Sequence, residues 1–138
     1  MWQPVSLQDL NPEAHAALAG VDRDAIAERA PMPLRWPDPY PADSRTAMLA
    51  AAFAKKSGRA VAFSLAAFRQ AFAAGRDLGE VDNVLVAAAA CELHPRAVLL
   101  GVELRSTRAE LDEGTAFARE HGVTELPALV EGGNVTAI

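Results

Sequence analysis

The sequence predicts an α+β protein that is mainly helical, and three observations support this fold class. Alanine, the residue with the highest helix propensity, occurs 30 times in 138 residues, most often between positions 42 and 97. Capping residues and glycines separate several stretches whose apolar residues have helical spacing. The last residues instead predict two short strands joined by Gly132-Gly133. The length and the apolar content predict a single domain over residues 1–138.

Charge and composition exclude several classes of protein. A formal net charge of −5 and a pI near 5.1 argue against a nucleic-acid partner, which requires a basic surface. The most apolar stretch, Val84 to Cys91, is far shorter than the roughly 20 residues that span a membrane. Cys91 is the only cysteine and has no partner for a disulfide within the chain. We therefore expect a cytoplasmic protein that binds neither nucleic acid nor membrane.

The first forty residues predict short elements and a proline-rich connector. Residues 2–8 have the apolar pattern of a short strand or extended segment. Asn11-Pro12 predicts the start of a helix that ends near Gly20, and Asp22 predicts another that runs through Ala30. Five of the nine prolines fall in 31–41, which excludes helix and central strand there. This connector carries Trp36 and Tyr40.

The two aromatic residues of the connector allow two interpretations. In the first, residues 31–41 form a strap that packs Trp36 and Tyr40 over the helices. In the second, Trp36 and Tyr40 form an aromatic wall that contacts a bound ligand. Packing is the commoner role for such residues, but the second interpretation makes Trp36 a candidate substrate-binding residue.

Three longer helices follow the connector. Asp43 or Ser44 is expected to cap a helix that runs to about Ser57, with Gly58 after it. The helix over 59–74 has an apolar stripe that we expect to face the core; it contains Val61, Leu65, Phe68 and Phe72. The third helix covers 79–92, with Val81, Val84, Leu85 and Ala88 inward.

The last third of the sequence predicts two more helices and a hairpin. Pro95 begins a short helix in which Val98, Leu99 and Val102 are apolar. Thr107-x-x-Glu110 has the pattern of a capping box, which predicts that the last helix begins there and ends near His121. Gly122 is the expected left-handed terminator of that helix.

Few residues in the sequence have the spacing of a catalytic or ligand-binding centre. Cys91 lies on an apolar stripe and is expected to be buried and inert; the alternative pairs it with His94, but no third orienting group is evident. The three histidines are scattered, so no metal site is predicted. Arg69 and Arg76 could bind an anion, although solvation at the surface is the commoner role.

The order of these elements resembles the DsbA-like family of thioredoxin-fold proteins. The stretch EHGVTELP followed by a strand is similar to the second half of the thioredoxin-like fold, where a cis-proline begins a core strand. AFRQAF, GRDL and the helix after them resemble the helical insertion of the family. LRWPDPYPADSRTAM is similar to a loop of the 2-hydroxychromene-2-carboxylate isomerase branch, which includes relatives of kappa-class glutathione transferases.

The resemblance implies a division of the chain and a fold. Residues 1–10 and 122–138 would form the thioredoxin-like sheet part, with an N-terminal strand, the cis-Pro strand and the hairpin. Residues 11–104 would form the helical insertion, and 105–121 the returning helix. The expected fold is thus a partial thioredoxin-like fold with a large helical insertion.

The resemblance also implies site residues. Pro127 would be the cis-proline, and the backbone of Leu126 would bind the cysteinyl part of glutathione as an added strand. Asp43, Ser44 and Arg45 occupy the segment that reaches the substrate in the isomerase branch. That branch has an amide where this sequence has Asp43, so a carboxylate ligand would require a cation such as Arg45 nearby.

The nucleophilic centre of the family has no counterpart in this sequence. No Cys-x-x-Cys is present, and the sequence begins at what resembles the second strand. We therefore expect the first strand to come from another chain, from exchange between two copies, or from residues before Met1. No catalytic residue is assigned, and we expect this chain alone to be incomplete or inactive as an enzyme.

Two functional hypotheses follow. The first is a DsbA-like or isomerase-like protein whose family activity is glutathione-dependent isomerisation or thiol-disulfide oxidoreduction. It implies glutathione or a small organic molecule as ligand, no metal, and a homodimer or a sheet-completing partner chain. The second is a non-catalytic helical module that captures a partner, or assembles, through an exposed strand edge.

Overall fold

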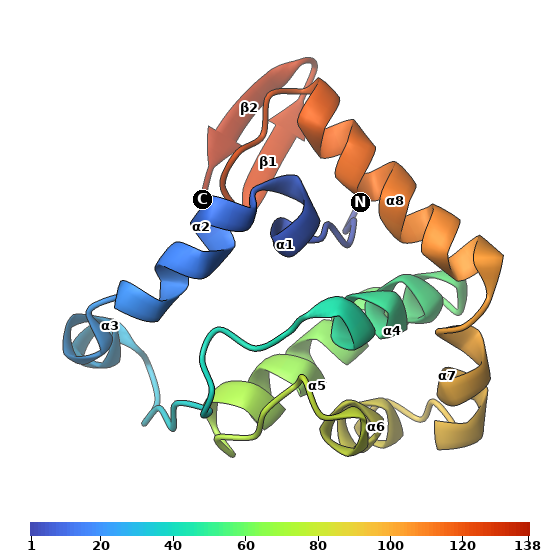
Figure 1. Cartoon of the computed structure of the whole chain (residues 1–138), viewed down its shortest axis with the longest axis horizontal. Coiled ribbons are helices and arrows are strands. Elements are labelled where there is room, and N and C mark those ends of the chain that lie inside the picture. The colour runs from blue at the N-terminus through green and yellow to red at the C-terminus, as the bar shows by residue number, and fades with distance from the viewer.

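The computed structural model describes residues 1–138 and confirms a mainly helical α+β fold (Figure 1). Its sheet consists of two antiparallel strands, and no third strand pairs with them. The helices are α1 Leu7–Leu10, α2 Pro12–Ala17, α3 Arg23–Arg29, α4 Arg45–Lys56, α5 Ala60–Phe72, α6 Val81–Ala90, α7 Pro95–Gly101 and α8 Arg105–Glu120, with a 3₁₀ turn at Leu18–Gly20. The strands are β1 Ala128–Glu131 and β2 Asn134–Ala137.

Several predicted helix ends are confirmed by their hydrogen bonds. The Asn11 side chain accepts from the amide of Ala14 at 3.1 Å, and Asp22 accepts from that of Ala25 at 3.0 Å. Gly58 and Gly122 have φ angles of +70° and +72°, the conformation expected of glycines that end a helix. Local sequence therefore determines where these helices begin and end.

The main core lies where α4, α5 and α6 pack together, and it consists largely of alanine. Phe63, Val84 and Val98 are the largest fully buried side chains in it. On its other side α4 packs Leu49 and Ala52 against Leu111 of α8. Alanine on both faces of α4 lets neighbouring helices approach closely. This helix therefore lies between the main core on one side and α8 on the other.

The expected apolar stripe of α5 is wrong, because the helix turns a different face to the core. Val61, Leu65 and Phe68 are about half exposed, and Phe72 is only partly buried. The buried residues of α5 are Ala60, Phe63, Ser64, Ala67 and Ala71. Because α5 is apolar nearly all round, spacing alone could not identify the inner face.

Two further expectations for the helices are wrong. Val81, which we expected to point inward, is 40% exposed and lies at the very start of α6. The last helix begins at Arg105, so Thr107 lies inside its first turn and makes no cap. Thr107 is fully buried, and its hydroxyl accepts a hydrogen bond from Lys56 Nζ at 3.3 Å.

The expected N-terminal strand is absent. The residues before α1 lie extended but pair with no strand, because the hairpin that would extend the sheet bonds only to itself. Side chains hold this segment instead: Trp2 Nε1 donates to Ser64 Oγ at 3.2 Å, and the amide of Ser6 donates to Thr115 Oγ1 at 3.1 Å. Residues 1–10 are therefore not part of a sheet, contrary to the expected division of the chain.

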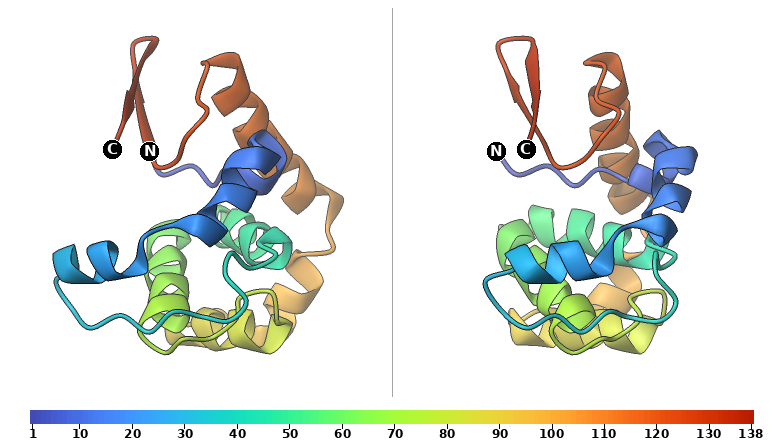
Figure 2. Two further views of the ribbon diagram at one scale, coloured as in Figure 1. Left: turned by 60° about the vertical axis from the view of Figure 1, so that its left-hand side comes forward. Right: turned by 90° about the vertical axis from the view of Figure 1, so that its left-hand side faces the viewer.

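The hairpin and the connector lie at opposite ends of the molecule. Figure 2 shows β1 and β2 standing clear of the helices at one end, while residues 31–41 cross the other end. Gly132 and Gly133 both have positive φ, as the predicted two-residue turn requires. The register pairs Ala128 with Ala137 and Glu131 with Asn134.

Candidate functional site

The backbone next to Pro127 forms an open edge. The Leu126–Pro127 peptide bond is cis, as are two other X–Pro bonds in the connector. The Pro127 carbonyl accepts a hydrogen bond from the amide of Ile138 at 3.2 Å, so Pro127 faces β2. The amide and carbonyl of Leu126 make no hydrogen bond within the chain.

The register extends this open edge along β1. In an antiparallel pair, successive residues point their amide and carbonyl groups alternately toward and away from the partner strand. Because Pro127 faces β2, the backbone groups of Ala128 and Val130 point outward. With Leu126 they form a row of three unpaired residues, which we call the β1 edge. Such a row can pair with an added strand.

One face of the hairpin is apolar. Alternation along the strands places Ala128 and Val130 on the same face as their cross-strand partners, Ala137 and Val135. Val135 is 39% exposed and Ala137 is also exposed, so the rest of the chain covers this face only in part. The β1 edge is therefore flanked by accessible apolar side chains.

The predicted substrate segment, Asp43 to Arg45, contacts the two short N-terminal helices. The amide and hydroxyl of Ser44 both donate to Gln8 Oε1, each at 3.1 Å. Asp43 Oδ1 accepts from the amide of Arg45 at 3.1 Å, and the side chains of these two residues form no ion pair. Asp43 thus bonds the first amide of α4, and Ser44, the N-cap residue, anchors α4 to α1.

The residues just before α4 and those before β1 both lie against the short helices α1 and α2. His15 Nε2 of α2 donates to the carbonyl of Ala42, and Asn11 Nδ2 donates to that of Thr124, both at 3.2 Å. Asp43, Ser44 and Arg45 therefore approach α1 and α2, as does the segment that leads to Leu126 and Pro127. Trp36 does not belong to this group.

Trp36 packs in an aromatic cluster at the end of α5. Its ring meets those of Tyr40 and Phe72 edge to face, with centroids 5.1 and 5.7 Å away. The guanidinium of Arg23 lies 5.1 Å from the Trp36 ring, within range of a cation–π interaction. Burial raises the pKa of Tyr40, and the charge of Arg23 partly opposes that rise. Residues 31–41 therefore pack Trp36 and Tyr40 against Phe72 of α5, as the strap interpretation expects.

The only cysteine is placed as a packing residue. Cys91 is buried, and its Sγ lies 3.3 Å from the Ala88 carbonyl, to which the thiol donates. His94 is exposed, and its Nδ1 accepts from the amide of Arg96 at 3.1 Å. Neither group is directed at the other, so the alternative Cys91–His94 pair is not formed. No three His, Cys, Asp or Glu side chains gather as metal ligands would.

A shallow groove runs between α5 and α6 on the outer surface of the helical block. It encloses about 620 Å³, and nine of its eleven lining residues are hydrophobic. Leu65 and Val86 are about half exposed and line it from α5 and α6. We call it the α5–α6 groove; its lining is Ala62, Leu65, Ala66, Arg69, Gln70, Ala73, Ala74, Val86, Ala87, Ala90 and Cys91.

Sequence reasoning missed this groove because it assigned Leu65 to the core. The sequence did indicate such a surface, because α5 is apolar on more than one face and one of these faces is left without a covering helix. Arg69 had been identified as a possible anion-binding residue, and the structure places it on the rim of the groove.

Compared with known proteins, the chain matches no family model, and no curated protein is significantly similar to it. None of the helices combines the length and the apolarity that a membrane crossing requires.

Proposed function

We propose that the protein is a DsbA-like, thioredoxin-fold relative of the 2-hydroxychromene-2-carboxylate isomerase branch that binds glutathione at the β1 edge. The observation that supports this most is the unpaired backbone of Leu126 beside Pro127. Glutathione is peptide-like, so its cysteinyl residue can offer one amide and one carbonyl to Leu126, as an added strand does. The proposal places the protein in the cytoplasm.

The neighbouring residues are consistent with this ligand. Glutathione carries carboxylates, and Arg45 is an exposed cation on the segment held by α1. Asp43 opposes an anionic ligand, but its Oδ1 is occupied by the amide of Arg45. No nucleophile is assigned at the β1 edge. Isomerisation or thiol exchange is therefore proposed from the family resemblance alone.

Glutathione is expected to raise the melting temperature of the protein, since a ligand that binds only the folded state stabilises it by mass action. The Ala128→Pro variant removes an outward amide of β1 and is expected to weaken glutathione binding about fivefold or more. Ala137→Pro is the matched control, because Ala137 is the cross-strand partner of Ala128 and its amide points outward from β2.

Thermal shift with glutathione and an amide NMR titration measure both effects. The titration should shift the amide signals of Leu126, Ala128 and Val130 in the unmodified protein. The proposal fails if glutathione leaves the melting temperature unchanged, or if the two proline variants lose binding equally.

A second candidate function is assembly through the same edge. It is favoured by the exposed apolar face of the hairpin, where Val135 is 39% exposed and Ala137 is also exposed. In this case the β1 edges of two copies pair with each other, or a partner chain supplies the strand, and no glutathione is required.

For self-assembly, light scattering after size exclusion should give about twice the chain mass of 14.6 kDa. Ala128→Pro should restore the single-chain mass, whereas Ala137→Pro should not. A mass of one chain at all concentrations tested would rule out pairing between copies.

A further inference from the structure

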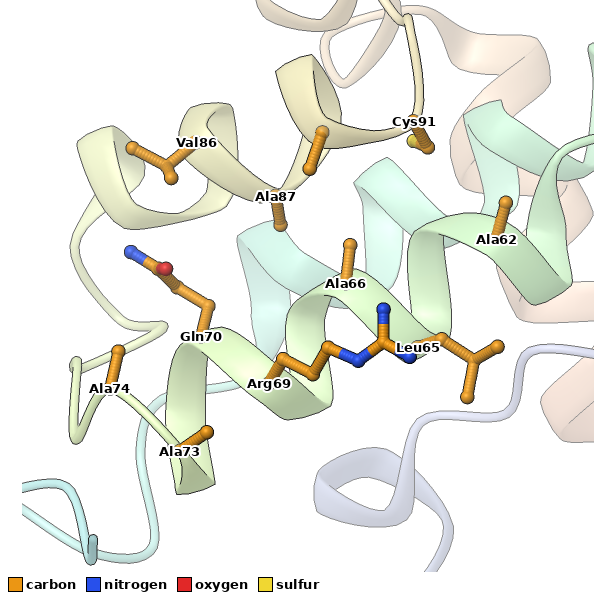
Figure 3. A pocket seen from close by; sticks show the side chains of 11 residues that line it. Ala62, Leu65, Ala66, Arg69, Gln70, Ala73, Ala74, Val86, Ala87 and Cys91 are labelled. Carbon is orange, nitrogen blue, oxygen red and sulfur yellow. The ribbon is translucent and has the colours of Figure 1, made fainter.

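The α5–α6 groove has two polar side chains at its margin and an apolar floor. Ala66 and Ala87 point into the groove from opposite helices, and Arg69 and Gln70 extend from α5 beside it (Figure 3). The guanidinium of Arg69 forms no ion pair or hydrogen bond within the chain, and neither does the Gln70 amide. No acidic residue lines the groove.

These features are those of a site for a small amphipathic ligand. Such sites are typically concave, mostly apolar and of a few hundred cubic ångströms, with a small number of polar groups that fix orientation. The lining contains no aromatic residue, so nothing in it stacks on a flat ring. Methyl groups from both helices instead favour an aliphatic chain. An unpaired arginine without a competing carboxylate favours an anionic head group.

The groove also limits the size of the ligand. Ala62 and Gln70 are the first and last lining residues within α5, and eight helical steps separate them by about 12 Å. A medium-chain acyl group spans a comparable length. Leu65 and Val86, both about half exposed, would lose contact with water when such a chain lies between them, which favours binding.

We propose that the α5–α6 groove binds a free medium-chain aliphatic carboxylate, with its chain between α5 and α6 and its carboxylate on Arg69. This site is separate from the β1 edge and does not depend on the glutathione proposal, because it uses different residues on different elements.

Decanoate is the probe that tests the proposal, used below the concentration at which it forms micelles. Calorimetry and a methyl NMR titration should show binding, with shifts at Val86 and the groove alanines. Decyltrimethylammonium has the same chain with the opposite charge and should bind distinctly more weakly. Arg69→Gln should weaken decanoate binding about three- to fivefold, whereas Arg105→Gln, an exposed arginine outside the groove, should not.

A second pair of variants tests the location. Ala90→Leu places a larger side chain in the groove and should block decanoate, whereas Ala89→Leu adds the same volume at an exposed alanine that does not line it. Both alanines are exposed, so neither change disturbs the core.

Four results would overturn the proposal, three of them from the binding experiments. The first is no binding of decanoate, and the second is equal binding of the two probes of opposite charge. The third is equal binding to the Ala90→Leu and Ala89→Leu variants. A chain mass that doubles in solution and returns to one copy with Ala90→Leu would show that a second copy covers the groove, which also excludes the carboxylate.

Discussion

Replacing Phe63 with alanine is expected to lower the free energy of unfolding by about 3–5 kcal/mol, the usual cost of removing a buried phenylalanine. Phe63 is 1% exposed and packs in the core formed by α4, α5 and α6. Such a loss is a large part of the total stability of a domain of this size. Phe68→Ala on the same helix should cost no more than about 1 kcal/mol, because Phe68 is 52% exposed.

Urea denaturation of the two variants, followed by circular dichroism, measures this difference. The comparison also tests the orientation of α5, because both substitutions remove the same side chain from the same helix. If the stripe of Val61, Leu65 and Phe68 faced the core, Phe68→Ala would be the more damaging change. Equal losses would contradict the burial of α5 described above.

Gly114→Ala is expected to destabilise the protein by about 1–3 kcal/mol, although alanine is the better helix former by about 1 kcal/mol. Gly114 lies in the middle of α8, where the N-terminal segment crosses it. A β-carbon at this position would meet the backbone carbonyl of Pro4 and the side chain of Gln3. The Pro4 carbonyl belongs to buried backbone, so the segment would have to move away from α8.

Gly20→Ala is the matched control for this substitution. Nothing lies within 4 Å of a β-carbon built at Gly20, and its φ is not positive. We therefore expect a change within about 0.5 kcal/mol. Thermal or chemical denaturation of both variants measures this difference in stability. A Gly114→Ala protein as stable as the original would show that the N-terminal segment does not lie against α8.

The N-terminal segment links this packing to the candidate site. It crosses α8 at Gly114, and the amide of Ser6 is held by Thr115. Ser6 also caps α1, whose Gln8 anchors the start of α4 at Ser44. Displacing the segment would therefore disturb the side of the molecule where Asp43 to Arg45 lie.

Several parts of the fold could be predicted because their cause is local. Asn11 and Asp22 accept the hydrogen bonds expected of N-caps, and Gly132-Gly133 forms the expected turn. The proline-rich connector lacks regular structure for the same reason, since proline removes an amide donor and restricts φ. Each of these features depends only on residues a few positions apart.

The candidate site could be predicted only in part. The backbone edge at Leu126 and the anchored segment at Ser44 lie on residues that the family resemblance indicated. Trp36 was assigned to a ligand by one interpretation, but its neighbours Tyr40, Phe72 and Arg23 come together only through tertiary packing. The α5–α6 groove was not predicted, because it exists only where α6 leaves one side of α5 uncovered.

The sequence by itself determined several helix ends, the hairpin and the absence of a disulfide within the chain, because these depend on local hydrogen bonding, turn conformation and composition. Only the tertiary structure decided which face of α5 is buried and that residues 2–6 bind side chains instead of a strand. The physical reason is that α5 is apolar on more than one face, so its burial depends on which helices lie beside it. The extended residues 2–6 likewise become a strand only where a strand partner is available.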